Sequence, residues 1–322
     1  MKARAPAVLL GALLAGVAGV VAAPPAFGQA WVSSQGEGYV GLGYLYAWAD
    51  LHLNAEGTPQ DLGSMLSGSL NLSGGYTPIE HLGISGGVTY VWTRYDRHGK
   101  SLAVLPNHGP HDDEHWHGSL QDARLEVRYN VLEEPLLVTP LAGIVVPTRE
   151  YETAGHAATG RGFVEAPVGL YVGRLLDPLL DGAWVQARYA YSFVENIKDN
   201  DTGEVLNLNR SNLDVEVGYY VSPSLSVRGF GAFQWTYGGL DVGVHPLSAP
   251  DFEDHDRRAR AIFQKLGIGA TYSTGAFDFS LIGSLTLGGQ NYVRVYTVGA
   301  FATWNFGRAA SFFGTKTRPA PQ

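Results

Sequence analysis

The segment that decides the fold spans residues 122–130 and reads Asp122-Ala123-Arg124-Leu125-Glu126-Val127-Arg128-Tyr129-Asn130. Charged and polar side chains occupy the even positions, and mainly apolar side chains occupy the odd ones. Successive side chains of a β-strand point to opposite faces of the sheet. A strand with four charges on one face does not lie in a dry protein core. One face of this strand therefore meets a polar interior, and the other meets an apolar phase.

The same alternation recurs along the chain in about twelve segments of roughly ten residues, as in transmembrane β-barrels. Connections are short after the even-numbered segments and mostly long after the odd-numbered ones. An even number of strands with both chain termini on the periplasmic side follows. The sequence therefore predicts an all-β, antiparallel up-and-down barrel in the outer membrane. The predicted strands are 38–51, 66–77, a third ending at Arg94, 122–131, 136–148, 163–175, 183–195, 212–221, 225–237, 265–274, 277–288 and 292–306.

Aromatic residues give an independent test, because they form girdles at both ends of the lipid-facing surface of such barrels. The alternation turns one set outward at the extracellular rim: Trp48, Trp92, Trp235, Tyr237 and Tyr292. It turns a second set outward at the periplasmic rim: Tyr76, Tyr129, Tyr219, Tyr272, Trp304 and Phe306.

A soluble β-sandwich or a lipocalin-like barrel is the alternative, with the apolar row inside and the polar row in water. Alternation alone does not separate the two folds. The alternating loop lengths, the aromatic girdles, and the glycines and serines of the polar row favour the membrane. The formal net charge of -8 argues against a nucleic-acid partner.

The two ends of the chain differ from the rest. Lys2 and Arg4 precede an apolar run from Val8 to Ala22 and a small-residue end at Gly28-Gln29-Ala30. This pattern predicts a signal peptide over residues 1–30 with cleavage after Ala30. Beyond it no stretch approaches the roughly 20 apolar residues of a spanning helix. Residues 31–306 then form the barrel, and residues 307–322 are expected to be a disordered tail.

Charged residues on the polar row face the lumen and control what passes or binds there. Both signs are present, so these residues either select a solute or pair with one another and narrow the lumen. The candidates are Asp122, Arg124, Glu126, Arg128, Glu165, Arg188, Asp214, Glu216, Arg228, Lys265 and Asp278.

The loop after the third strand concentrates histidines and carboxylates. His108, His111, His115 and His117 are candidate ligands for Zn or Cu. Their loose spacing enforces no ligand geometry and favours an acidic, solvated loop. A later loop carries Arg257, Arg258 and Arg260, for which contact with lipopolysaccharide phosphates and plain solvation are both open.

Occlusion of the lumen is expected only from long loops or lumen side chains. About seven residues separate Ala30 from Gly38, which is too short for an N-terminal plug domain. The histidine-rich loop and the loop around Asp251 are expected to be the only segments long enough to close the barrel.

Catalysis is not expected. Some outer-membrane barrels of this size are lipid hydrolases with a serine and a histidine on the outer face, but no such pair stands out here. The chain also lacks a Gly-x-Ser-x-Gly nucleophile motif. No cofactor is predicted, and the absence of cysteine removes disulfides and thiolate chemistry.

Three short motifs resemble a family of proteobacterial outer-membrane proteins named after the meta-pathway of phenol degradation, the MetA-type hydrophobic-compound transporters. They are Gln29-Ala30-Trp31-Val32 through Gly36-Glu37-Gly38-Tyr39-Val40, then Val145-Val146-Pro147-Thr148, and finally Gly289-Gln290-Asn291 with Val298-Gly299 and Trp304-Asn305-Phe306. Arg149 stands where the family has glycine after Pro-Thr, and residues follow Phe306 where such barrels usually end.

The resemblance implies passage of a small hydrophobic or aromatic solute across the outer membrane. The alternative is a closed structural or surface-binding barrel, with metal capture by the histidine-rich loop as one form of it. Expected partners are outer-membrane lipid, lipopolysaccharide, the solute, and the barrel-assembly machinery during biogenesis.

Overall fold

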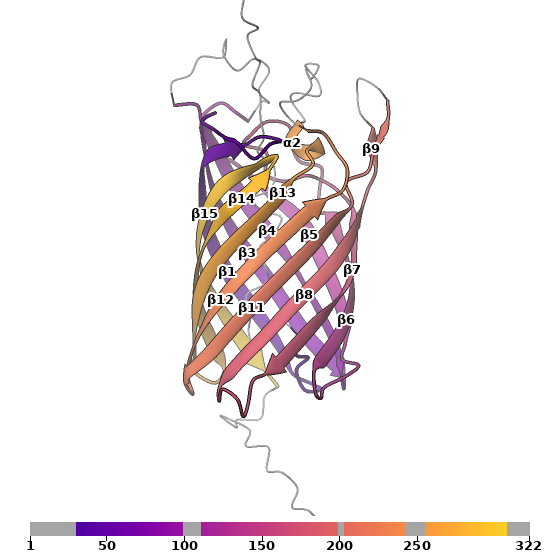
Figure 1. Ribbon diagram of the computed structural model, residues 1–322, viewed down its shortest axis with the longest axis vertical. Coiled ribbons are helices and arrows are strands. Elements are labelled where there is room, and N and C mark those ends of the chain that lie inside the picture. Colours follow the sequence, from indigo (N-terminus) through magenta and orange to yellow (C-terminus); the bar gives the residue numbers. More distant parts are fainter. Residues whose placement is uncertain (1–29, 99–110, 199–202, 242–254, 308–322) are drawn as a thin grey trace, which may run out of the picture.

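Twelve antiparallel strands close into one barrel in the computed structural model, which describes residues 30–98, 111–198, 203–241 and 255–307 (Figure 1). Each strand pairs with its neighbours along the chain, and β15 pairs with β1 to complete the circle. The strands are β1 (Gly38–Leu53), β3 (Ser64–Ile79), β4 (Leu82–Asp96), β5 (His117–Tyr129), β6 (Leu137–Pro147), β7 (Glu165–Leu175), β8 (Ala183–Val194), β11 (Arg210–Ser222), β12 (Leu225–Thr236), β13 (Ile262–Ser273), β14 (Phe277–Gln290) and β15 (Tyr292–Phe306).

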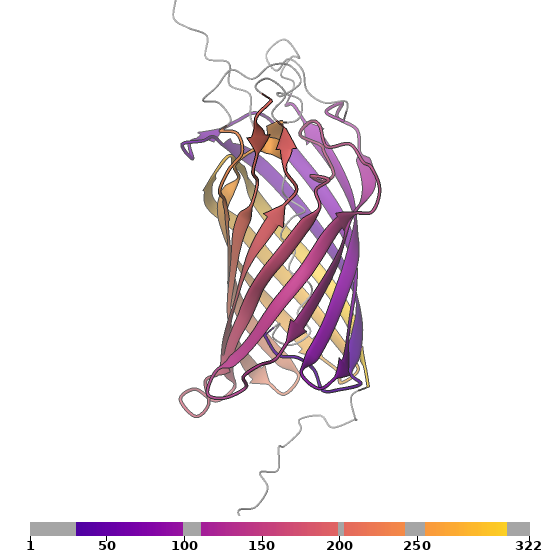
Figure 2. The ribbon, with the colours of Figure 1, turned by 90° about the vertical axis from the view of Figure 1, so that its right-hand side faces the viewer.

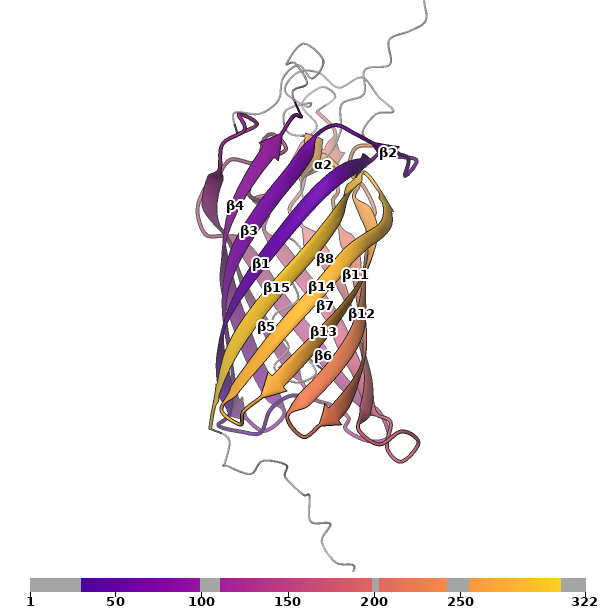
Figure 3. The same ribbon diagram turned by 90° about the vertical axis from the view of Figure 1, so that its left-hand side faces the viewer.

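Four short elements lie outside the barrel wall. They are β2 (Pro59–Gln60), the β9–β10 ladder (Ile197–Lys198 and Val205–Leu206) and the one-turn helix α2 (His255–Arg258). Figures 2 and 3 show the tilted strands from two further sides, with the short turns gathered at one end and the longer connections at the other. We call the end with the longer connections extracellular, because barrels of the outer membrane carry their longer loops there.

The outward surface of the barrel is apolar. On β1, Val40, Leu42 and Tyr44 are exposed, whereas Gly41 and Gly43 between them are buried. A soluble sandwich or lipocalin would bury the large apolar row, so that alternative is wrong. The predicted membrane barrel is confirmed, and its predicted strands match those of the structure to within a few residues at most ends.

The structure corrects the prediction for strand four. β5 begins at His117, five residues before Asp122, and a bulge near Gln121 separates its two parts. A β-bulge adds a residue to one strand and changes which side chains share a face. The regular alternation therefore starts only at Asp122, where the sequence shows it.

Of the eleven aromatic residues predicted for the girdles, eight are exposed, Trp92 and Phe306 are partly exposed, and Tyr292 is buried. Trp48, Trp235 and Tyr237 are exposed at the extracellular rim, and Tyr76, Tyr129, Tyr219, Tyr272 and Trp304 are exposed at the periplasmic rim. Tyr292, predicted to face lipid, is only 2% exposed. It follows the tight β14–β15 turn, in which Asn291 has a φ of 48°, and its ring stacks on Phe263 with the centroids 4.2 Å apart.

Most of the two chain ends lies outside the described residues, including residues 1–29 of the predicted signal peptide and residues 308–322 of the predicted tail. In the part of the chain that the structure describes, no helix has the length and apolar character needed to cross a membrane.

Candidate channel lumen

All eleven charged residues predicted to face the lumen lie on the inner side of the barrel, and none of them is exposed. They come together in layers along the barrel axis. The layers contain further residues that the sequence did not single out, notably Arg210, Tyr171 and Tyr151.

The central layer is an ion-pair network between three strands. The guanidinium of Arg188 on β8 lies 3.2 Å from the Glu126 carboxylate on β5 and 3.7 Å from the Asp214 carboxylate on β11. The hydroxyl of Tyr171 on β7 donates to Glu126 at 3.2 Å, and the Arg188 guanidinium lies 5.6 Å from the centre of the Tyr171 ring. Arg128 approaches the same ring at 6.0 Å. One aromatic ring thus joins both cations to the network.

A second group lies beside it, on the wall nearer the periplasm. Glu216 on β11 lies 3.5 Å from the Arg228 guanidinium and accepts hydrogen bonds from the Trp184 indole at 3.1 Å and the Gln186 amide at 2.9 Å. Further along the wall, Asp278 accepts a 2.8 Å hydrogen bond from Asn305. These carboxylates are held by donors on neighbouring strands.

The extracellular layer contains two more carboxylates. Glu165 on β7 forms an ion pair with Arg210 on β11, and Asp122 on β5 accepts a 2.5 Å hydrogen bond from the Tyr151 hydroxyl. Arg210 lies an even number of positions from Asp214 and Glu216 and so shares their face of the strand. Extending the predicted strand 212–221 by two residues towards the N-terminus would have included it. Tyr151 lies in a loop, where strand alternation gives no signal.

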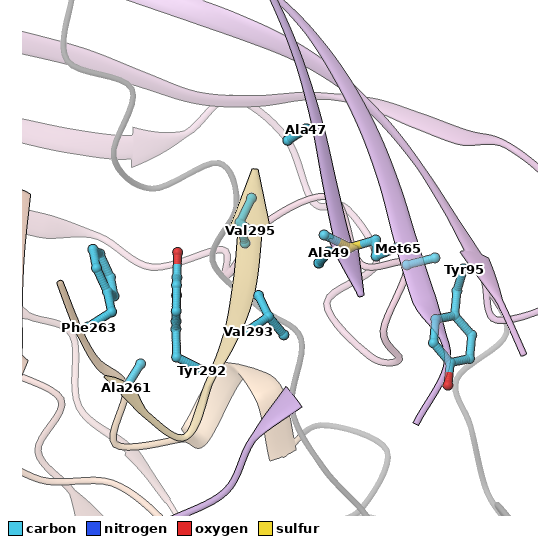
Figure 4. Packing of buried hydrophobic residues seen from close by; sticks show 10 residues of the cluster. Ala47, Ala49, Met65, Tyr95, Ala261, Phe263, Tyr292, Val293 and Val295 are labelled. Atoms are coloured by element: carbon cyan, nitrogen blue, oxygen red, sulfur yellow. The ribbon is translucent and has the colours of Figure 1, made fainter. Parts of the chain in front are cut away.

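The opposite wall of the extracellular half is apolar, although it also faces the lumen. Residues of β1, β3, β4, β13 and β15, together with Ala261 just before β13, form one buried cluster there (Figure 4): Ala47, Ala49, Met65, Tyr95, Ala261, Phe263, Tyr292, Val293 and Val295. The Lys265 ammonium lies 4.8 Å from the Phe263 ring and 5.2 Å from the Tyr292 ring. A cation over aromatic faces is attracted by the ring quadrupoles. The lumen therefore has a charged wall and an apolar wall.

The loop between β6 and β7, residues 148–164, folds into the lumen from the extracellular end. Ala157 is fully buried within the apolar cluster, and its carbonyl accepts a hydrogen bond from Thr93 on β4. The expectation that only the histidine-rich loop and the Asp251 loop could enter the lumen is therefore wrong. The loop contains small residues, from Ala154 to Gly160, that fit between the walls.

The histidine-rich loop holds the β6–β7 loop in place. Asp112 is buried, and its carboxylate accepts hydrogen bonds from the backbone N–H groups of His156 at 2.9 Å and Ala157 at 2.8 Å. The predicted metal site is not assembled by the described residues, among which no group of three or more ligands could hold a metal ion. His108 lies outside the described residues.

The described histidines of that loop interact with each other and with Asp113. The rings of His111 and His117 stack with centroids 4.1 Å apart, and Asp113 bonds the His117 ring at 2.7 Å. Hydrogen bonds from His117 and from the backbone N–H of His115 lower the pKa of Asp113 to about 2. Partial burial lowers the pKa of His111, and the neighbouring His117 lowers it further.

A cavity of about 140 Å³ lies beneath the β6–β7 loop, between the two walls. Met65, Val91 and Phe263 line its apolar side, and Asp122, Arg124, Glu165 and Arg210 line its charged side. Residues 158–161 of the loop cover it. Its size is close to that of the cavity of roughly 150 Å³ that binds benzene in an engineered protein.

The residues before β1 cross the periplasmic end of the lumen. The expectation that only long loops or lumen side chains could occlude the barrel is therefore wrong here as well. The Ala30 N–H donates to the Gln186 side chain on β8 at 3.0 Å, and the Ala30 carbonyl accepts from Thr139 on β6 at 2.8 Å. Trp31 packs with them against Leu137 and Tyr171. A plug domain is not needed, because a few extended residues reach across.

The three arginines of the extracellular loop are engaged within the protein. Arg260 forms two hydrogen bonds with Asp241, at 3.0 and 2.6 Å. The Arg257 guanidinium lies 4.7 Å from the Phe163 ring and donates to the Arg161 carbonyl at 2.9 Å, and Arg258 is buried. These contacts do not support the suggested role in binding lipopolysaccharide phosphates.

No family model matches this sequence, and no curated protein matches it significantly. Among solved structures, the COG4313 outer membrane channel from Pseudomonas putida F1 is similar over 88% of this chain and 100% of its own, with a TM-score of 0.66 and 11% identity. At this identity the likeness shows the fold, a barrel of the outer-membrane type.

Two other similar structures have TM-scores below 0.5, and we draw no argument from them. The translocator domain of the autotransporter NalP from Neisseria meningitidis has a TM-score of 0.48 and 9% identity over 84% of this chain and 89% of its own. The CymD monoaromatic hydrocarbon channel has a TM-score of 0.41 and 15% identity over 86% of this chain and 90% of its own.

Proposed function

We propose that this protein is an outer-membrane channel for a small solute that combines a ring-sized apolar part with polar groups, such as a single-ring aromatic compound. The observation that carries the proposal is the cavity under the β6–β7 loop. A water-filled porin has a polar interior, whereas this lumen places Met65, Val91 and Phe263 opposite a charged wall.

The family resemblance supports the same class of solute. The motifs around Gly38, Val145 and Trp304 resemble those of the MetA-type hydrophobic-compound transporters. The barrel also shares its fold with a protein described as an outer membrane channel. The eleven lumen charges then orient the polar groups of the solute and exclude other molecules, and the mature channel begins after a signal peptide that ends at Ala30.

A closed barrel that does not transport is the second candidate, and one observation favours it. Arg188 bridges Glu126 and Asp214, so these charges are paired with each other across three strands of the wall. Paired charges narrow a lumen as readily as they select a solute. The two candidates differ in conductance, which is above background for a channel and absent for a closed barrel.

Uptake into proteoliposomes tests the proposed solute. We expect phenol and benzoate to enter vesicles that contain the purified protein faster than they enter empty vesicles, and we expect glucose not to do so. Ser67→Trp places an indole in the cavity from β3 and should abolish the difference, because Ser67 lines the cavity.

The matched control is Leu66→Trp, which adds the same ring to the lipid-facing side of the same strand and should leave uptake unchanged. Equal uptake in protein-containing and empty vesicles would refute the channel, as would single-channel recordings in planar bilayers that stay at background. Uptake that is insensitive to Ser67→Trp would place the path elsewhere in the barrel.

A further inference from the structure

The segment before β1 spans the lumen from one wall to the opposite one. Along the closed wall, β1 and β8 are separated by six steps, through β3, β4, β5, β6 and β7, and twelve strands complete the circle. Two strands of this barrel cannot be farther apart. The chain leaves β1 at Gly38 and reaches β8 at Ala30, where it bonds Gln186. The chain therefore reaches the wall opposite β1. After cleavage at Ala30 it begins at Trp31, which packs against residues of β6, β7 and β8 on that same side.

The segment is held at both ends. Near β1, the Gly36 N–H donates to the Thr77 carbonyl at 2.8 Å, and the Gln35 side chain donates to the Pro78 carbonyl at 3.3 Å. At the far end, Trp31 packs against the cluster of Leu137, Leu141, Tyr171 and Ala190. Between these contacts Ser33 and Ser34 are exposed. The contacts of Trp31 remain in the exported chain even when cleavage follows Ala30.

The surface under Trp31 is shaped to receive it. Gly173 on β7 faces the lumen at this point, and a Cβ added there would lie 2.9 Å from the Ala30 Cβ and 3.0 Å from Cη2 of the Trp31 ring. Any side chain at this position would therefore push the segment away. Around the glycine, Leu137, Leu141 and Tyr171 form an apolar patch on a wall whose next residues, Gln186 and Arg188, are polar.

We propose that residues Trp31–Glu37 are a releasable periplasmic stopper, and that the Trp31 indole occupies a site for the aromatic ring of the solute. The inference rests on the proposed function. A solute leaving the cavity towards the periplasm meets this patch, of which Tyr171 is a part. Because the patch already binds an indole from the protein itself, a planar aromatic ring is the ligand class that it fits, and the solute displaces Trp31 as it leaves.

Two variants remove the stopper from opposite sides. Trp31→Ala deletes the ring, and Gly173→Leu fills the space beneath it without changing the segment. Both should raise the conductance of the full-length exported protein in planar bilayers several-fold. The matched controls are Trp116→Ala, an exposed tryptophan of the extracellular loop, and Val172→Leu on the outer face of β7. Both controls should conduct like the wild type.

Free indole then tests the ring site. It should reduce the conductance of Trp31→Ala towards the wild-type value and leave the Trp116→Ala protein unchanged, and cyclohexanol at the same concentration should have little effect. If the wild type conducts above background, unchanged conductance in both Trp31→Ala and Gly173→Leu would overturn the stopper. If the conductance of Trp31→Ala is raised but indole does not reduce it, or if cyclohexanol reduces it equally, the aromatic site would be overturned.

A readout without transport separates this inference from the proposed function. The chain contains no cysteine, so Val32→Cys introduces a single thiol in the segment. A water-soluble maleimide should label it several-fold faster when Gly173→Leu is also present. Faster labelling with conductance at background in every variant would keep the stopper and refute the channel, and an equal labelling rate would refute the stopper.

Discussion

Two adjacent aspartates of the histidine-rich loop illustrate how position determines the role of a residue. The carboxylate of Asp112 is buried and accepts two backbone N–H groups of the β6–β7 loop. Asp113 is exposed and bonds the His117 ring within its own loop. One residue therefore shapes the lumen, and the other only organises the extracellular surface.

The pKa of Asp113 is lowered to about 2 from an ordinary 3.8, chiefly by the hydrogen bond from His117. A carboxyl whose pKa is lower in the folded state stabilises that state above its ordinary pKa. We therefore expect the local stabilisation to be complete at pH 7 and to disappear as the pH falls from about 4 to about 2.

A ¹³C titration of the Asp113 carboxyl in detergent micelles measures this directly. The wild type should titrate near pH 2, and His117→Ala, which removes the side-chain hydrogen bond, should titrate at a higher pH. His115→Ala is the control, because the backbone N–H of that residue remains. An identical midpoint in the wild type and His117→Ala would show that His117 does not lower the pKa.

Strand alternation predicted the face of each lumen charge but not its partners. Arg188 pairs with Glu126, which precedes it by 62 residues and lies three strands away along the wall. Such pairs depend on the curvature of the closed barrel and on the length of the side chains. The two-residue alternation of a strand gives no information about either. The same reason explains why the interaction of Tyr151 with Asp122 was not predicted.

At the scale of elements, loop length proved a poor guide to occlusion. The middle of the β6–β7 loop, Ala154-Gly155-His156-Ala157-Ala158-Thr159-Gly160, lies between the walls. Its residues are small apart from His156, whose side chain is itself buried. This run of mostly small residues is the signal that the sequence offered. The backbone groups that it buries are bonded by Asp112 and Thr93, as buried backbone groups require.

Asp112→Ala should release the β6–β7 loop. The change leaves two buried N–H groups without acceptors, and each such loss costs about 1–3 kcal/mol. We expect faster trypsin cleavage after Arg161 and a higher conductance. Asp113→Ala is the matched control, since Asp113 forms its hydrogen bonds with His115 and His117 of its own loop. Equal cleavage rates in the two variants would show that Asp112 is not the anchor.

At the scale of the whole molecule, the lipid-facing surface decides where the protein resides. Ile268 lies near the middle of β13 and is 73% exposed. A lysine at the bilayer midplane of a barrel costs about 2–4 kcal/mol, and one near the interface costs about 0–1 kcal/mol.

Ile268→Lys should therefore destabilise the barrel far more than Gln264→Lys, which adds the same charge at the extracellular end of the strand. Urea unfolding in lipid vesicles gives the difference in the free energy of unfolding. Equal destabilisation by the two substitutions would contradict a membrane-embedded surface.

The architecture was largely predictable from the sequence. The closure of the barrel, the number of strands and the side of the wall that each residue faces all depend on local alternation and on the positions of turns. The exceptions lie at the two openings. Tyr292 turns inward after a tight turn, and Trp31 lies against strands that come more than 100 residues later in the chain. Tyr292 is the first residue of β15, directly after the turn, and Trp31 precedes β1. The alternation within a strand therefore did not predict where either side chain lies.

The placement of Trp31 also imposes an order on assembly. Its binding surface combines residues of β6, β7 and β8, and it exists only after these strands have paired. Trp31 is synthesised before all of them. The first residues of the barrel to leave the ribosome are thus among the last to reach their final position. The segment closes the periplasmic end of the lumen only after these strands of the wall have formed.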